Sequence, residues 1–261
     1  MPRAREKLRR ARENERMPHT PAVEIAVQDP AGVRIAGEVG AARVELAQAL
    51  TLGGLTPSPA TLELCLAVAA EAGVEVHVLV RPRAGDFHYD ADEIALTELD
   101  VRRAIAAGAH GVVVGALDDD ARLDLDAMAR LRDAADGASV TLHRAIDVTP
   151  DPVATLAAAR SLGLRRVLTS GGASAAIDGI DTLRRLVAEA AGDIEVMAGS
   201  GVDAASAPAL AATGADALHF SAKRTVLAQG GVRMGSAADG VGGYEVTDLA
   251  TARAIVAAIA G

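Results

Sequence analysis

Along most of the chain, Ala-rich stretches that end at a glycine alternate with short runs of β-branched residues. Glycine is the residue expected just past a helix end, because the chain turns there through a left-handed conformation. The short runs, such as 74–80 and 111–114, have the length and composition of strands. The pattern therefore predicts a helix-to-strand step at each of these residues: Gly40, Gly73, Gly108, Gly137, Gly163, Gly192 and Gly214.

These glycines lie 22 to 35 residues apart, which suits one strand, one helix and two short loops. Seven steps require eight strands, of which the first is predicted at 22–27, and the last helix is predicted at 246–260. Strict alternation of strands and helices is typical of a parallel sheet. Eight such units over residues 23–261 predict an α/β fold with a single (β/α)8 TIM barrel. An open, doubly wound sheet is the alternative.

Polar and aliphatic residues alternate inside several of these strands. Strand side chains point alternately to the two faces, and the outer face of a barrel must be apolar because helices pack on it. In the run 74–80 the valines therefore face the helices, while His77 faces the barrel axis. In the runs at 111–114 and 166–169, the sequence does not show which side chains face inward. The same reasoning places these residues inside the barrel: Glu24, Arg43, Glu45, Glu75, Arg81, His143 and His219.

An interior with so many ionisable groups has two interpretations, because a buried charge must find a partner or face a wet cavity. One is a stabilising network of internal ion pairs, which we favour for Glu75 near the start of its strand. The other is a ligand site at the C-terminal ends of the strands, where barrel enzymes place their active sites. We favour the site for His77, Arg81, His143 and Arg144.

Composition narrows the class of protein. The net charge of −9 argues against nucleic acid as the main partner. No apolar run approaches the roughly 18 residues that a membrane-spanning helix needs, and no secretory signal is recognisable. The single cysteine, Cys65, excludes an intramolecular disulfide framework and fits a reducing compartment. We therefore expect a cytoplasmic protein.

The N-terminal segment differs from the rest of the chain. Residues 1–16 hold seven Lys or Arg and three Glu, although the whole chain is acidic. They can form a basic arm for an acidic partner, or a disordered tail, or they can precede a true start at Met17. We treat residues 1–22 as a disordered, basic extension.

The loop after the third strand, 81–89, reads RPRAGDFHY and holds two of the four aromatic residues of the chain. At the barrel mouth, Asp86 would hold an arginine or the next helix. Phe87 and Tyr89 would line a pocket or pack on a neighbouring subunit.

Two later loops, 168–174 and 197–202, each join a strand to a helix through small residues and glycines. Backbone N–H groups in such loops bind anions, although both loops can also be ordinary tight turns. The candidate ligand-binding residues are Ser170, Gly171, Gly172, Gly199, Ser200 and Gly201.

Several short motifs occur together and in order: RVEL at 43–46, GGLTPS at 53–58, RPR.GDF at 81–87, HRA.D at 143–147, VLTSGG at 167–172 and AGSGV at 198–202. In this combination the chain resembles the CutC family, a family of TIM-barrel proteins linked by name and genetics to copper homeostasis. The resemblance covers most of the chain. It implies the barrel fold, a role in copper homeostasis or copper binding, and a homo-oligomer, most simply a dimer.

The resemblance has a gap at the residues proposed to bind Cu(I). Family members to which that role is assigned carry cysteines in the first two strands, where this chain has Ala26, Val27 and Ala47. Cu(I) prefers soft sulfur ligands. Cys65 falls in the helical pattern after the second strand, where a small core residue is expected. Copper is therefore implied by resemblance only, and the identity of any bound metal stays open.

Two classes of function follow. The first is a copper-homeostasis or copper-binding protein. The second is an enzyme on a small phosphorylated or carboxylated metabolite, with histidines as acid or base and arginines as anion clamps. Lys223 can form a Schiff base or be merely solvated, and three inward histidines can hold zinc. The candidate catalytic residues are Glu45, His77, Arg81, Asp86, His143, Arg144, Asp147 and His219.

The single cysteine predicts that this protein has no tight Cu(I) site of the thiolate type. Anaerobic titration with Cu(I) against a competing chelator should leave the copper on the chelator. Stoichiometric transfer to the protein that disappears in Cys65→Ala would contradict the prediction.

Overall fold

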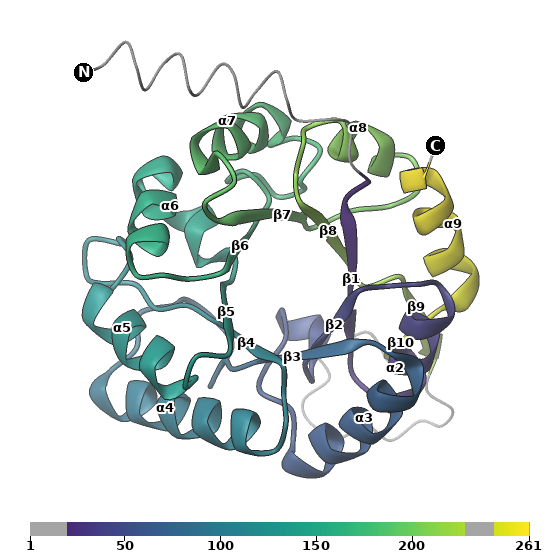
Figure 1. The fold of residues 1–261 in the computed structure, drawn as a ribbon, viewed down its shortest axis with the longest axis horizontal. Coiled ribbons are helices and arrows are strands. Elements are labelled where there is room, and N and C mark those ends of the chain that lie inside the picture. The colour runs from purple at the N-terminus through teal and green to yellow at the C-terminus, as the bar shows by residue number, and fades with distance from the viewer. Residues whose placement is uncertain (1–19, 228–242, 261) are drawn as a thin grey trace.

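Eight parallel strands form a closed barrel surrounded by helices (Figure 1). The computed structural model describes residues 20–227 and 243–260. Each strand pairs with the next, and the eighth pairs with the first. This confirms the predicted (β/α)8 TIM barrel and excludes the open sheet. The strands are β1 (Ala22–Val27), β2 (Arg43–Leu46), β3 (Glu75–Leu79), β4 (Gly111–Val114), β5 (Ser139–Leu142), β6 (Arg166–Thr169), β7 (Glu195–Gly199) and β8 (Ala217–Phe220).

A helix follows every strand, and local sequence sets its ends. The Ser58 hydroxyl accepts a hydrogen bond from the Thr61 N–H at 3.2 Å, and Pro59 opens that helix, as predicted. All seven glycines predicted at helix ends have positive φ. The helices are α2 (Pro30–Glu38), α3 (Pro59–Ala72), α4 (Ala91–Ala106), α5 (Leu125–Ala134), α6 (Pro152–Ser161), α7 (Ile180–Ala190), α8 (Ala207–Ala211) and α9 (Leu249–Ala260), with the 3-10 helices η1 (Leu50–Leu52) and η2 (Arg144–Val148).

The C-terminal region departs from the prediction. After β8 the chain forms an antiparallel pair, β9 (Lys223–Leu227) and β10 (Gly243–Thr247), so residues 246 and 247 are in a strand rather than in the predicted helix. The Asp248 carboxylate accepts from the Thr251 N–H at 2.9 Å, and α9 begins one residue after Asp248. Of the predicted basic extension, residues 1–19 lie outside the described part of the chain.

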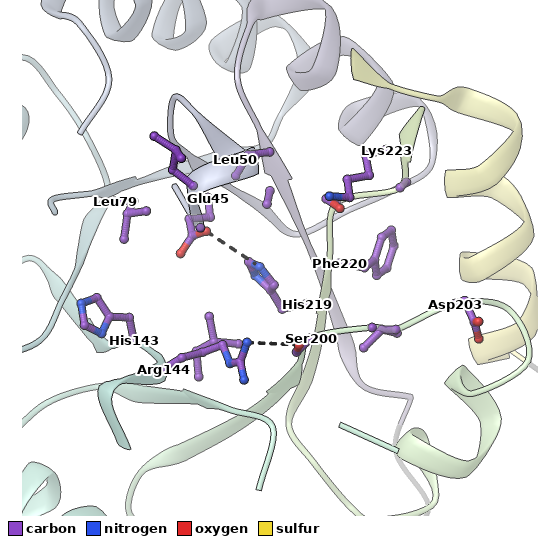
Figure 2. Close-up of a pocket in the computed structure, with 18 of the residues that line it drawn as sticks. Glu45, Leu50, Leu79, His143, Arg144, Ser200, Asp203, His219, Phe220 and Lys223 are labelled. Atoms are coloured by element: carbon purple, nitrogen blue, oxygen red, sulfur yellow. Dashed lines mark hydrogen bonds and ion pairs between the residues drawn. The ribbon is translucent and has the colours of Figure 1, made fainter. Parts of the chain in front are cut away.

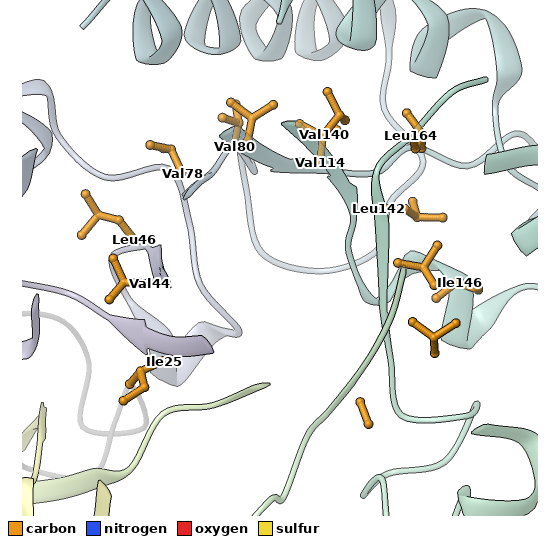
Figure 3. Close-up of a cluster of buried hydrophobic side chains, with 14 of the residues drawn as sticks. Ile25, Val44, Leu46, Val78, Val80, Val114, Val140, Leu142, Ile146 and Leu164 are labelled. Carbon is orange, nitrogen blue, oxygen red and sulfur yellow. The ribbon is translucent and has the colours of Figure 1, made fainter. Parts of the chain in front are cut away.

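The main apolar core lies between the strands and the helices, not inside the barrel (Figure 3). Val76, Val78 and Val80 belong to it, which confirms their predicted outward direction. Inside the barrel the apolar clusters are small: Ala47 with Leu79 and Val113, and Leu168 with Met197 and Ala217. The aliphatic outer layer therefore accounts for most of the apolar burial, and the interior is left to polar groups.

Glu24 is the centre of the charges inside the barrel. Its carboxylate is fully buried and accepts hydrogen bonds from Arg43 Nε at 2.6 Å and His219 Nδ1 at 2.7 Å. Glu24 is the register partner of both residues, so the contacts join β1 to β2 and to β8. A second pair, Arg166 with Glu195 at 2.7 Å, joins β6 to β7. Ion pairs thus neutralise part of the charge that the sequence predicts inside the barrel.

Glycine makes room for one of the inward histidines. A Cβ at Gly111 would lie 2.6 Å from the Ser139 carbonyl oxygen and 2.7 Å from His77 Nδ1. Position 111, the register partner of His77, therefore has no room for a larger residue, and Val113 of the same strand faces the interior. None of the helices in the described ranges is long and apolar enough to span a bilayer.

We predict that Glu24→Ala lowers the free energy of unfolding by about 3–5 kcal/mol, because it leaves a buried arginine without its carboxylate. Urea denaturation measures the loss. The matched control is Glu38→Ala, which removes a half-exposed partner of Arg253 and should cost less than about 1 kcal/mol. Equal losses in the two variants would contradict the central role of Glu24.

Candidate functional site

A cavity of about 590 Å³ opens at the C-terminal ends of the strands, where the sequence predicts the site. Its wall combines residues from the strands with residues from the loops after β2, β3, β5, β7 and β8 (Figure 2). The predicted site residues that line it are Glu45, Arg81, His143, Arg144, Ser200, Gly201 and His219. Those that lie outside it are His77, Asp86, Asp147, Ser170, Gly171, Gly172 and Gly199.

His219 and Glu45 form an acid–base pair on the cavity wall. His219 Nδ1 hydrogen-bonds to Glu24 at 2.7 Å, which leaves Nε2 facing Glu45 Oε2 at 3.8 Å (Figure 2). Because Glu24 is buried behind the ring, it fixes both the orientation of the imidazole and the nitrogen that is free to exchange a proton.

Burial and neighbouring charges perturb the pKa values of all three groups. Burial alone would raise the pKa of Glu24, but the hydrogen bond from His219 and the charges of His219 and Arg43 hold that pKa far below its ordinary value. Burial raises the pKa of Glu45 to about 7, because the charge of His219 offsets it only in part. Burial lowers the pKa of His219, but the carboxylates of Glu45 and Glu24 reverse this and raise it. Glu45 therefore titrates near neutral pH, beside a histidine whose pKa is raised.

Arg81 organises two loops at the cavity mouth. Its Nη1 donates to the Leu52 and Gly54 carbonyl oxygens, both at 3.0 Å, and its Nη2 donates to the Gly85 carbonyl oxygen at 2.8 Å. These acceptors are neutral. Within the described residues no carboxylate lies within ion-pair distance of Arg81, so its positive charge is left for the cavity.

His143 begins the loop after β5 and caps η2. Its Nδ1 accepts a hydrogen bond from the Ala145 N–H at 3.1 Å. Burial, together with the charge of Arg81, lowers the pKa of His143 to about 3, so the ring is neutral. Gly115 is needed beside it, because a Cβ there would collide with the ring. Phe87 packs against the ring with centroids 4.6 Å apart.

Asp147 fills the glycine loop that the sequence predicts as an anion site. Its carboxylate accepts from the Ser170 N–H at 3.0 Å and from the Gly172 N–H at 3.1 Å. Arg144 Nε donates to the same carboxylate at 2.8 Å, and Nη1 reaches Ser200 Oγ at 3.1 Å. The protein thus supplies its own anion to this loop. The ligand role predicted for residues 170–172 stays a prediction.

Two of the predicted catalytic residues face away from the cavity. His77 Nε2 lies 3.2 Å from the carboxylate of Glu75, which is mostly exposed, so this pair belongs to the opposite, N-terminal side of the interior. Asp86 is exposed and pairs with Arg83 at 3.1 Å, as predicted for an aspartate that holds an arginine. The expected convergence at the barrel mouth is therefore right for Arg81, His143 and His219 and wrong for His77, because His77 lies too near the start of its strand.

The wall also contains residues that the sequence did not single out. Ser221 and Ala222 follow β8, and Thr251 and Ile255 come from α9. Lys223 lines the same cavity, and its amine forms an ion pair with Glu245 at 2.7 Å. This pairing agrees neither with a free amine for a Schiff base nor with a lysine that contacts solvent alone. No local signal marks the α9 residues, because they reach the cavity only through barrel closure. Ser200, which also lines the cavity, has a φ of +89°, a strained backbone conformation for a serine.

The site is that of a barrel protein with an acid–base pair and an arginine in one cavity. Residues 22–224 match the family model described as the CutC family. A CutC family protein of Xanthomonas campestris pv. campestris is 43% identical over 235 residues, which cover 90% of this chain and 97% of the relative. One of Agrobacterium fabrum is 47% identical over 188 residues, or 72% of this chain and 73% of the relative.

The fold agrees with these matches. The crystal structure of a CutC protein from Streptococcus agalactiae, whose name proposes a role in copper homeostasis, superposes with a TM-score of 0.74 and 29% identity. It covers 77% of this chain and 98% of the other. This chain belongs to the CutC family, as its motifs suggest.

We predict that His143 makes the protein sensitive to acid. The pKa of His143 is about 3 in the native state and near 6.5 in the unfolded chain, so the unfolded chain binds the proton more tightly. As pH falls from 7 to 5, this one residue should cost about 2 kcal/mol of stability. In His143→Asn, which can still cap η2, that part of the pH dependence should vanish. Urea denaturation at both pH values tests it, and an unchanged pH dependence would contradict the prediction.

Proposed function

We propose that this chain is an enzyme that uses Glu45 and His219 for acid–base chemistry on a small anionic metabolite. The observation that carries the proposal is the position of His219, held by Glu24 on one side and open to Glu45 and the cavity on the other. A general acid or base works best when its pKa is near the working pH, and burial brings the pKa of Glu45 to about 7. One partner can therefore take a proton from a substrate while the other gives one.

Arg81 supports the anionic character of the substrate. Its guanidinium is rigidly held by three carbonyl oxygens and has no carboxylate partner in the described part of the chain. Arg144 contributes less, because Asp147 already neutralises it. A charge-assisted hydrogen bond is roughly twice as strong as a neutral one.

Metal binding is the second candidate function, and the copper named for the Streptococcus relative gives it a reason. Glu24, Glu45 and His219 offer ligand atoms within 4.8 Å of one another. These oxygen and nitrogen donors suit Cu(II) or Zn(II) but not Cu(I), which prefers thiolates. Cys65 is buried in the helix layer, where burial raises its pKa to about 11, and the described part of the cavity lining includes no cysteine or methionine. The donors present therefore do not fit a Cu(I) site.

To test the enzyme, a thermal-shift screen of phosphorylated and carboxylated metabolites identifies a ligand, whose turnover is then followed. We predict that Glu45→Gln still binds this ligand but reacts about 10²–10⁴-fold more slowly. The control is Glu75→Gln, which changes another inward glutamate outside the cavity and should react normally. Unchanged turnover in Glu45→Gln would overturn the proposal.

For the metal, calorimetric titration of the wild-type protein with Cu(II) and with Zn(II) decides between the candidates. A metal site of Glu24, Glu45 and His219 predicts binding that Glu45→Gln weakens strongly and Glu75→Gln does not. Binding that is equal in both variants, or no binding, would rule out this site.

A further inference from the structure

Two buried N–H groups beside the cavity have no hydrogen-bond acceptor among the described residues. They are Arg81 Nε and His143 Nε2, on residues that are 7% and 5% exposed. Native proteins rarely leave a buried donor unsatisfied, because the group gives up its water without replacement. Both residues line the cavity, so the acceptor that they lack can come from a ligand.

At Nε2, the ring of His143 can only donate a hydrogen bond. Its Nδ1 accepts the Ala145 N–H, so the proton of the neutral ring is on Nε2. Burial keeps the pKa of His143 near 3, so the ring stays neutral and in this form throughout the physiological range. Nε2–H therefore seeks an oxygen acceptor.

Arg81 supplies the positive charge of the same region. Its Nη atoms are bound to the carbonyl oxygens of Leu52, Gly54 and Gly85, which lock the guanidinium in place. The Tyr89 hydroxyl also lies beside this guanidinium, but it is neutral. The Nε–H belongs to a charge that no carboxylate of the described residues balances. An anionic acceptor fits this donor better than a neutral one.

The ring of Phe87 lies against both residues that carry these donors. It lies 4.6 Å from the His143 ring, and the Arg81 guanidinium carbon lies 5.4 Å from its centroid. The face of an aromatic ring attracts a cation but is a poor substitute for an oxygen acceptor. Phe87 is half-buried and packs against the main apolar core, in a loop where Gly85 has a φ of +98°. The ring thus contacts both residues that carry the unsatisfied donors.

We propose that the cavity wall at Arg81 and His143 is a carboxylate subsite, in which the ring of Phe87 moves aside and the carboxylate oxygens accept from Arg81 Nε–H and His143 Nε2–H. A carboxylate is planar like the ring that it replaces, carries the charge that Arg81 lacks, and has two oxygens for two donors. The inference rests on the proposed function for the cavity as substrate site. It deepens that function by making the substrate a carboxylic acid, with its carboxylate at His143 and its reacting atoms toward Glu45 and His219.

The test uses the folded full-length protein and three probes: acetate, glycolate and inorganic phosphate. In protein labelled with ¹⁵N-histidine, long-range ¹H–¹⁵N spectra follow the Nε2–H of His143, whose signal is assigned from its absence in His143→Asn. Acetate and glycolate should move this proton downfield and leave the ring neutral. Phosphate should not. Saturation with carboxylate without a shift would overturn the proposal, and a shift with phosphate alone would overturn the carboxylate assignment.

Affinity gives an independent readout. Phe87→Ala removes this ring, so acetate and glycolate should bind about tenfold more tightly, because the ring no longer has to move aside first. His143→Asn should weaken them. The control is Leu64→Ala, which trims an exposed apolar side chain of α3 outside the cavity, and it should bind like wild type. Equal affinity in Phe87→Ala and Leu64→Ala would contradict the subsite.

The two proposals can fail separately. If a metabolite turns over and Glu45→Gln abolishes turnover, but His143 never responds, the subsite is wrong and the acid–base function stands. If carboxylates shift His143 while Glu45→Gln reacts like wild type, the subsite stands and the catalytic role of Glu45 is wrong.

Discussion

A buried carboxylate at the seam of the barrel is the constraint on which the rest of this structure depends. Glu24 lies on β1, which pairs with both β2 and β8, and it holds one cation on each neighbour, Arg43 and His219. Without these partners the charge could not remain in a dry interior. The same contacts tie the first strand to the last. One carboxylate therefore both reinforces the junction that closes the barrel and orients His219.

The division between an aliphatic outer layer and a polar interior makes such a site possible. Packing between strands and helices buries the valines and leucines, so the interior need not be apolar throughout (Figure 3). Residues of the same type therefore differ in their partners and in their charge. Arg144 is neutralised by Asp147, whereas the hydrogen bonds of Arg81 go to carbonyl oxygens and no carboxylate of the described residues pairs with it. His77 pairs with Glu75 at the N-terminal side of the barrel, whereas burial keeps His143 neutral at the C-terminal side.

Family membership does not by itself settle what the cavity does. The match to CutC proteins covers the barrel from residue 22 to 224, including the strands that carry the acid–base pair. The thiol ligands expected for Cu(I) are missing from the first two strands, yet the interior carboxylates and histidines remain. The features of the site that are present therefore argue for proton transfer and anion binding more directly than for soft-metal chemistry.

The sequence alone determined the barrel, because seven regularly spaced glycines mark the helix ends and several strands show the alternation of polar and aliphatic residues. It also determined that Arg81, His143 and His219 face inward at the mouth. Only the tertiary structure decided which inward groups are already partnered, since Asp147 and the amides of 170–172 are 23 residues or more apart and meet only in the fold. The contact of Phe87 with Arg81 and His143 likewise depends on packing between separate loops. Hydrogen-bond satisfaction is a property of three-dimensional neighbours, and no one-dimensional pattern encodes it.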